Sequence, residues 1–101
     1  MPSSKEYLNF VLEQLSNLNN ITYRPMMGEF LIYYNNKLVG GIYDDRLLVK
    51  PIKEVKEFMK NFHCEKPYEG AKEMLLVDNV DDKEYLTELF NLLYEKLPNK
   101  K

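Results

Sequence analysis

The chain has 101 residues, which is enough for one domain around one hydrophobic core. Hydrophobic residues make up 45% of it and charged residues 30%, the proportions of an ordinary soluble globule, which exclude a fibre, a disordered tail or a membrane span. Fourteen basic and sixteen acidic side chains give a net charge of −2, which argues against a protein whose main task is to neutralise nucleic-acid phosphates.

The sequence also carries information about the cellular compartment. Cys64 is the single cysteine, so an internal disulfide is excluded. The residues after Met1 form no apolar stretch of the kind that a secretion signal needs. The longest apolar runs, such as residues 74–77, are far shorter than the roughly 20 residues of a membrane helix. We therefore expect a cytoplasmic protein with no membrane association and a single domain over residues 1–101.

The first predicted element is a helix that begins near Ser4 and ends before Asn19. Ser3 and Glu6 have the spacing of a capping box, in which two side chains satisfy the free backbone N–H groups at a helix start. Apolar side chains follow at intervals of three and four residues, at Leu8, Val11, Leu12, Leu15 and Leu18.

Four strands are predicted next, because segments rich in β-branched and aromatic residues alternate with short breaks. They cover residues 21–24, 29–34, 37–43 and 46–50. Asn35-Asn36 and Asp44-Asp45 are two-residue connections of types that tolerate a positive φ, so each is predicted to close a tight hairpin. These four strands should form an antiparallel meander.

A second helix is predicted over residues 52–62, where the apolar positions return to helical spacing. Pro67 and Gly70 indicate a loop over residues 63–70, and the short apolar run at residues 73–77 indicates a strand that is buried on both faces.

The last helix is predicted to have Asp81 as its N-cap, with Glu84 three residues later, and to stop at Pro98. The element order is therefore α-β-β-β-β-α-β-α. This order predicts an α+β domain of two layers, with a largely antiparallel sheet and the helices on one of its faces.

Counting outward from the two hairpin loops predicts how the strands pair and which side chains share a face. The predicted pairs are Tyr34 with Lys37, Ile32 with Val39, Phe30 with Gly41, Tyr43 with Arg46, and Gly41 with Leu48. The face beneath the helices should carry Leu31, Tyr33, Leu38, Gly40, Ile42, Leu47 and Val49. The outer face should carry Phe30, Ile32, Tyr34, Val39, Tyr43 and Leu48, together with Lys37, Arg46 and Lys50.

This predicted outer face is unusually apolar for a surface in water. An exposed aromatic and aliphatic patch with a basic rim suggests a protein partner, since monomers seldom expose large contiguous apolar areas. A second copy of the chain, in a two-fold homodimer, would cover such a patch. The open alternative is that the stems of Arg46 and Lys50, the first strand and the loop after Phe62 cover it.

No motif in the sequence points to a metal, a cofactor or a catalytic set. His63 and Cys64 are adjacent and are the single residues of their types, whereas a zinc site needs about four ligands. No spaced His, Cys and Asp or Asn set is present to activate a thiol. The acidic residues from Asp78 to Glu84 lack the alternating ligands of a calcium loop. We therefore expect no catalytic residues, no metal and no cofactor.

Two other classes of function remain open at this point. Arg24, Glu29, Tyr33 and Tyr68 come from separate segments and would form the pocket of a small-ligand sensor or an uncharacterised enzyme if the fold brought them together. Residues 46–60 are rich in lysine and arginine, whereas residues 72–95 are acidic. Glutamates interrupt the basic stripe of the second helix, so direct nucleic-acid binding is not favoured.

Three segments resemble the TfoX/Sxy N-terminal domain family: residues 23–29 (YRPMMGE), 40–50 (GGIYDDRLLVK) and 67–74 (PYEGAKEM). The resemblance extends from the opening helix to Leu97-Pro98. It implies an α+β domain from the bacterial cytoplasm, found either in regulators of natural competence or as a free-standing small protein.

In those regulators the domain is joined to a C-terminal domain and works with the cyclic-AMP receptor protein to promote transcription of DNA-uptake genes. The resemblance covers the N-terminal domain alone and supplies no catalytic residues. The function we expect from the sequence is a non-enzymatic regulatory module that binds a protein partner such as a transcription regulator.

Overall fold

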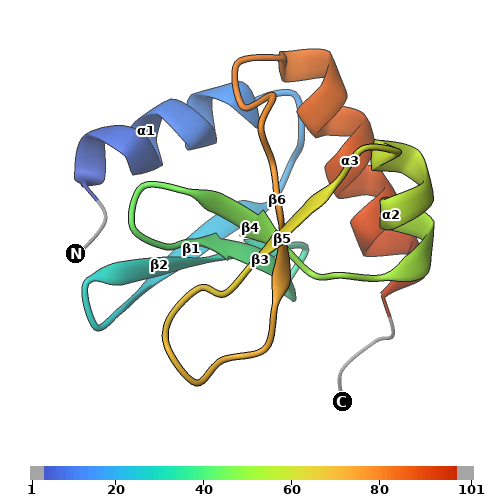
Figure 1. Cartoon of the computed structure of the whole chain (residues 1–101). Coiled ribbons are helices and arrows are strands. Elements are labelled where there is room, and N and C mark those ends of the chain that lie inside the picture. Colours follow the sequence, from blue (N-terminus) through green and yellow to red (C-terminus); the bar gives the residue numbers. More distant parts are fainter. Residues whose placement is uncertain (1–3, 98–101) are drawn as a thin grey trace.

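The computed structural model describes residues 4–97, which form three helices packed against a six-stranded antiparallel sheet. The strand order is β1-β2-β3-β4-β6-β5. Figure 1 shows the helices above and to the right of the sheet, while the connection between β5 and β6 lies on its other side. The predicted α+β class and the order of the predicted elements are confirmed. The elements are α1 (Lys5–Gln14), β1 (Ile21–Met26), β2 (Glu29–Tyr34), β3 (Lys37–Ile42), β4 (Leu47–Val49), α2 (Lys53–Met59), β5 (His63–Glu65), β6 (Met74–Leu76) and α3 (Lys83–Lys96).

The helix starts are fixed by side-chain caps. The Ser4 hydroxyl accepts a hydrogen bond from the Tyr7 N–H at 3.1 Å, which agrees with the predicted start of α1 but makes Ser4, and not Ser3 of the predicted capping box, the N-cap. At α3 the N-cap is Asp82, whose carboxylate accepts from the Tyr85 N–H at 3.1 Å. The predicted cap, Asp81, was therefore one residue too early, because two adjacent aspartates offer the same chemistry.

Helix ends were predicted less well than helix starts. α1 ends at Gln14, several residues before the predicted boundary at Asn19, and Leu15 is already its C-cap. α2 ends at Met59, because Lys60 has a positive φ of 65° and turns the chain. The predicted stop of α3 at Pro98 lies outside the described residues.

A strand, β5, lies within the segment that was predicted to be a loop over residues 63–70. It pairs antiparallel with β6, with His63 opposite Leu76 and Glu65 opposite Met74. Its three residues are too few to show an alternating pattern. The strand forms because its backbone pairs with the edge of β6, and the local sequence does not predict it.

The pairing of β2 with β3 departs from the predicted register. Tyr34 lies opposite Lys37 as predicted, but a β-bulge follows, so that Ile32 lies opposite Gly40 and not Val39. The pairs predicted for Ile32 and for Phe30 are therefore wrong. The register between β3 and β4 is confirmed by the predicted pair of Gly41 with Leu48.

The bulge reverses the predicted faces of β2. Phe30, Ile32 and Tyr34 lie toward the helices, and Ile32 and Val39 are fully buried core residues. The opposite side of the sheet carries Leu31, Tyr33 and Leu38, which were predicted to face the helices. Beyond the bulge the prediction is correct, because Ile42, Leu47 and Val49 belong to the core.

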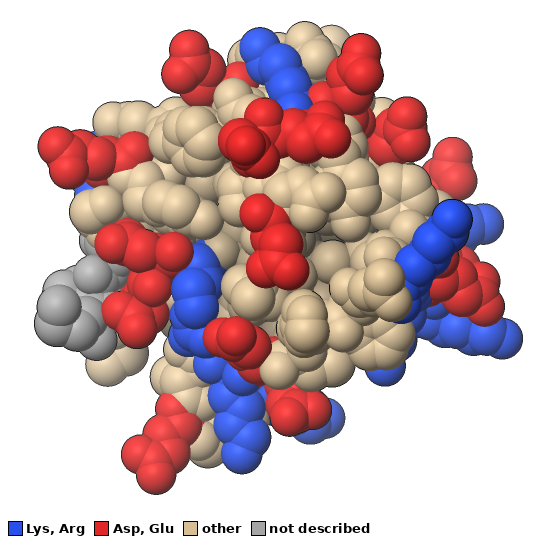
Figure 2. All heavy atoms as spheres, turned by 45° about the horizontal axis from the view of Figure 1, so that its top comes forward, with Lys and Arg blue, Asp and Glu red and all other residues tan. Residues whose placement is uncertain are grey.

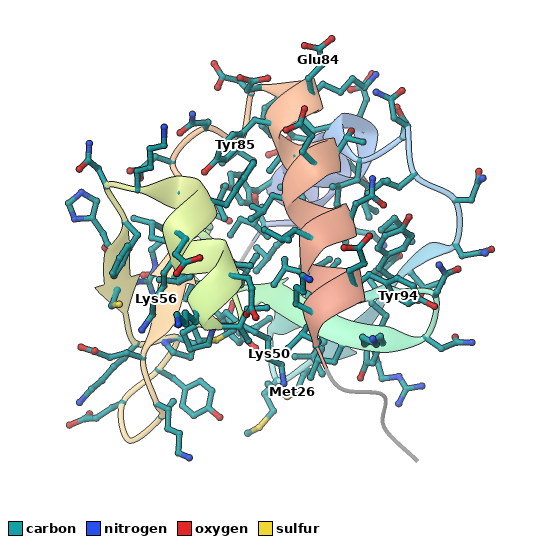
Figure 3. All side chains as sticks on the ribbon, turned by 90° about the vertical axis from the view of Figure 1, so that its right-hand side faces the viewer. Met26, Lys50, Lys56, Glu84, Tyr85 and Tyr94 are labelled. Carbon is teal, nitrogen blue, oxygen red and sulfur yellow. The ribbon has the colours of Figure 1, made fainter. Side chains whose placement is uncertain are left out.

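One core joins the sheet to all three helices. α2 stacks against α3 through the rings of Phe58 and Tyr85, whose centroids are 5.3 Å apart, and Figure 3 shows Tyr85 between these two helices. The core residues are Leu8, Val11, Leu15, Ile32, Val39, Ile42, Leu47, Val49, Val55, Leu75, Val77, Leu86, Leu89, Phe90 and Leu93.

The hairpin between β2 and β3 is also tied to the end of α3. Lys37 donates from Nζ to the carbonyl oxygens of Tyr94 at 2.7 Å and Leu97 at 2.8 Å, and its ammonium lies 4.5 Å from the centre of the Tyr94 ring. The Tyr34 hydroxyl donates to Asn91 Oδ1 at 2.9 Å. A cation is well placed here, because the last carbonyls of a helix carry partial negative charge.

Candidate functional site on the outer side of the sheet

The residues predicted to form an exposed interaction face do not form one. Ile32, Val39 and Leu48 have no exposed surface, and Tyr43 is only 6% exposed. Phe30 and Tyr34 are half-buried and pack against the core. The prediction of an exposed apolar patch at these positions is wrong, because the bulge turns the β2 residues and Val39 inward and the chain after β5 covers Tyr43.

Arg46 anchors the connection between β5 and β6 to the sheet. Its guanidinium forms an ion pair with Glu65 and donates to the Lys66 carbonyl oxygen at 3.3 Å. Its Nε donates to the Tyr43 carbonyl oxygen at 3.2 Å. Arg46, predicted as part of a basic rim, thus joins the β3–β4 turn to the end of β5.

The anchored connection places Tyr68 over the outer side of the sheet. Pro67 is buried, and the Tyr68 ring lies 6.2 Å from the Tyr43 ring. Tyr43 in turn lies over Gly41, where a Cβ atom would be only 2.8 Å from the Tyr43 ring. The missing side chain of Gly41 therefore makes room for the tyrosine pair.

Burial and nearby negative groups act on Tyr43. Its pKa is raised above 10.0, first by burial and then by the fields of Tyr68, Glu29 and Tyr33. The hydroxyl therefore stays protonated at neutral pH. It can donate or accept a hydrogen bond but does not act as a base there.

A mainly apolar hollow of about 470 Å³, which we call the methionine hollow, lies beside Tyr68 and is lined by Met26, Met27, Glu29 and Tyr68. Met27 has a positive φ of 51° in the turn between β1 and β2 and is 97% exposed. Glu29 accepts a hydrogen bond from the Asp44 N–H at 3.1 Å. In Figure 3, Met26 lies at the end of the molecule remote from Glu84.

A second hollow, of about 300 Å³, also has Tyr68 in its lining, together with Leu38, Tyr43 and Lys50. Tyr68 is 57% exposed and is shared by the two hollows. Lys50, predicted to lie on the interaction face, is half-buried at this second hollow and contributes a cation to it.

Three of the four residues proposed from the sequence as a pocket lie close to Tyr43, and the fourth, Arg24, contacts one of these three. Glu29 and Tyr68 line the methionine hollow, and Tyr33 is close enough for its field to raise the pKa of Tyr43. Arg24 lies over the Tyr33 ring, with its Cζ 5.7 Å from the ring centre. Sequence reasoning omitted the two methionines, whose only signal was their place within the YRPMMGE segment.

Charge is distributed unevenly over the helical side. Acidic side chains predominate in the upper part of the face in Figure 2, while lysine and arginine side chains gather at its right-hand and lower edges. α2 lies on that right-hand side and carries Lys53 and Lys56, with Glu54 and Glu57 between and after them. Lys56 also lies 5.6 Å from the centre of the Phe62 ring.

Within residues 4–97, no group of three His, Cys, Asp or Glu side chains is arranged to hold a metal ion. Cys64 is an exposed free thiol on β5, next to the exposed His63. None of the helices in the described part of the chain combines the length and the apolar character needed to cross a lipid bilayer.

We expect the raised pKa of Tyr43 to appear in the alkaline stability of the protein. Unfolded tyrosine loses its proton near pH 10.0, before the folded residue does, so stability is present below pH 10.0 and falls as the pH rises above it. Tyr43→Phe should make this fall shallower. Urea unfolding at about pH 8 and about pH 11 measures it, and an unchanged slope in the variant would contradict the assigned environment.

The outer side thus unites residues from all three segments that the sequence analysis singled out. A model of the TfoX N-terminal domain matches residues 13–94. The chain is 34% identical over 80 residues to an "uncharacterized 12.7 kDa protein in trpE 5′region" of Spirochaeta aurantia, covering 79% of this chain and 70% of that protein. No solved structure gives a significant match. The family match spans most of the described fold, and the chain belongs to the TfoX N-terminal domain family.

Proposed function

We propose that the protein is a non-enzymatic regulatory module and that it binds a protein partner through the methionine hollow. The observation that carries this proposal is Met27, an apolar side chain that is 97% exposed at the rim of an apolar hollow of about 470 Å³. An apolar side chain held in water at a turn gains free energy when a partner covers it.

The chemistry of the hollow favours an apolar side chain of a protein segment as the occupant. Methionine is flexible and polarisable, so it adapts to partners of different shape. The exposed Tyr68 ring supplies a rigid apolar surface with a hydroxyl at its rim, a residue type enriched at protein interfaces. A leucine, methionine or phenylalanine of the partner would lie between Met27 and Tyr68.

The construction of the site also supports binding. Arg46 fixes the chain before Tyr68, and the Asp44 N–H holds the carboxylate of Glu29, so both walls of the hollow are attached to the sheet. A site that is ordered before binding loses less conformational entropy when the partner docks.

Family membership suggests what kind of partner the site binds. In the competence regulators that contain this domain, it acts with another transcription regulator, and we propose a partner of that kind for this chain. The role would then be regulatory, in the cytoplasm, with control of DNA uptake as one such process.

The experiment is affinity capture from a lysate of the source bacterium with wild type, Met27→Glu and Phe10→Glu. Phe10 is an exposed apolar residue on α1, 40% exposed, and serves as a matched control for the added charge. We expect Met27→Glu to lose a partner that wild type and Phe10→Glu retain, with a loss of affinity of roughly tenfold or more. Identical partners for all three proteins would overturn this site.

Glu29 and Tyr68, two of the four residues proposed from the sequence as a pocket, line this hollow and support a second candidate function, a sensor of a small ligand that binds there. A thermal-shift screen with metabolites separates the two. A ligand at 100 times its dissociation constant stabilises the fold by about 2.7 kcal/mol, which raises the melting midpoint by roughly 10–20 °C for a domain of this size.

A further inference from the structure

β1 lies at the edge of the sheet, and its outer backbone groups form a second surface to which another strand can pair. β1 is the first strand in the sheet order, and among residues 4–97 it pairs with β2 only. In Figure 3 the light-blue chain that leads from α1 into β1 runs along the right-hand rim of the molecule. An edge strand presents backbone donors and acceptors to any chain that can pair with it.

The hydrogen-bond pattern identifies which residues point outward. The Asn35 N–H donates to the Asn20 carbonyl oxygen at 3.0 Å, so Asn20 faces β2. Because the residues of an antiparallel strand alternate, Ile21, Tyr23 and Pro25 direct their backbone groups away from β2. Pro25 has no N–H, so complete pairing is available only at Ile21 and Tyr23.

We propose that a second copy of this chain pairs with β1, in a two-fold dimer whose axis passes through Thr22. In this register Ile21 lies opposite Tyr23 of the other copy, and Tyr23 opposite its Ile21. Both outward residues of both copies then exchange both of their hydrogen bonds. In a register centred on Tyr23, the Tyr23 pair would keep both of its bonds, but each of the two Ile21–Pro25 pairs would keep only one, because Pro25 has no N–H.

Charge favours a second copy over a charged partner. The ten residues from 14 to 23 contain no charged side chain, in a chain of which 30% is charged. Edge strands are commonly protected by charged residues, and here Arg24 provides the first charge after this segment. In the proposed register the two Arg24 residues are separated by four positions along the strand, about 13 Å, which exceeds the screening length of about 8 Å.

A hollow beside β1 provides room for the side chains of the second copy. It measures about 570 Å³ and lies between the end of α1 and β1, with Leu12, Leu15 and Leu18 among its lining residues. Ile21 packs toward the core, and Tyr23 meets Phe30 edge-on with ring centroids 5.9 Å apart. Both side chains therefore lie on the helical side, so the second copy's Tyr23, which is 40% exposed, would enter this hollow.

Analytical ultracentrifugation of the whole chain at micromolar to submillimolar concentrations tests the proposal. We expect wild type to reach the mass of two chains as the concentration rises. Thr22 is exposed, so Thr22→Arg and Thr22→Glu should each fold normally but set like charges opposite each other at the axis, and weaken the dimer by roughly tenfold or more. An equimolar mixture of the two variants should restore it.

Met27→Arg is the matched control, because it adds the same charge at the end of the same hairpin and five positions from the axis. It should dimerise as wild type does. A single-chain mass for wild type at all concentrations would overturn the proposal, as would a dimer that Thr22→Arg leaves intact or that the mixture fails to restore. Thr22 variants that remain monomeric but still capture the partner of the methionine hollow would show that the two surfaces act independently.

Discussion

Ile32→Lys is expected to abolish the folded state. Ile32 has no exposed surface and lies within the core, where an ammonium group would have neither water nor an acidic partner. An unpaired buried charge costs several kcal/mol, against a total stability of about 5–15 kcal/mol for a domain of this size. Circular dichroism and urea unfolding should show the loss of a cooperative transition.

Tyr33→Thr is the matched control, because Tyr33 is the next residue along the same strand and lies on the opposite side of the sheet. The substitution removes the contact between the Tyr33 ring and Arg24, whose Cζ lies 5.7 Å from the ring centre. Such a contact at an exposed site is worth about 0.5–1 kcal/mol. The variant should therefore stay folded. A folded Ile32→Lys protein would mean that β2 presents Ile32 to solvent and that the β-bulge is not formed.

Gly40→Ala is expected to destabilise the protein by about 3 kcal/mol, an unusually large effect for the addition of one methyl group. The new Cβ would lie 2.3 Å from the Leu48 carbonyl oxygen and 2.9 Å from the Val49 Cα. Both atoms belong to the backbone of the paired strand β4, which cannot move away without breaking the ladder.

Gly70→Ala provides the comparison for this second variant. Gly70 has a φ of 89°, and no heavy atom would lie within 4 Å of a Cβ atom at this position. Alanine there causes backbone strain but no steric clash, so the variant should be destabilised by about 1–2 kcal/mol. Urea unfolding of the two variants gives both values. A cost at position 70 equal to or above that at position 40 would contradict the close approach of β3 and β4.

Local chemistry was sufficient to predict the turns and most element positions. Asn35, Asn36, Asp44 and Asp45 all adopt the positive φ that the two-residue hairpins require. Helical spacing identified all three helices, since that pattern depends on which residues must be buried. Their ends were less certain, because the turn at Lys60 comes from a residue type with no preference for a positive φ.

The β-bulge could not be predicted, and this error spread to the predicted interaction face. A regular ladder and a bulged one share the same closing pair, Tyr34 with Lys37. They differ in whether Ile32 and Val39 are buried, which depends on helices distant in the sequence. Because successive side chains alternate between faces, one extra residue was enough to reverse β2.

The candidate site was predicted in part. Glu29 and Tyr68 were singled out because they belong to distinctive segments, and both line the methionine hollow. Tyr43 was correctly assigned to the outer face, but as an exposed residue apart from this pocket, and Met27 was assigned to no site. Their convergence depends on the anchoring of the β5–β6 connection by Arg46, an interaction between residues 19 positions apart that no local pattern encodes.

The bulge at Val39 also bears on the order of folding events. The Asn35-Asn36 turn closes the hairpin quickly, since such loops form in roughly microseconds, but it permits both the regular and the bulged register. Only the burial of Ile32 and Val39 against residues such as Phe90 of α3 distinguishes between them. The hairpin alone therefore does not select one register early in folding. The register of β2 and β3 forms in the same cooperative step in which α3 docks.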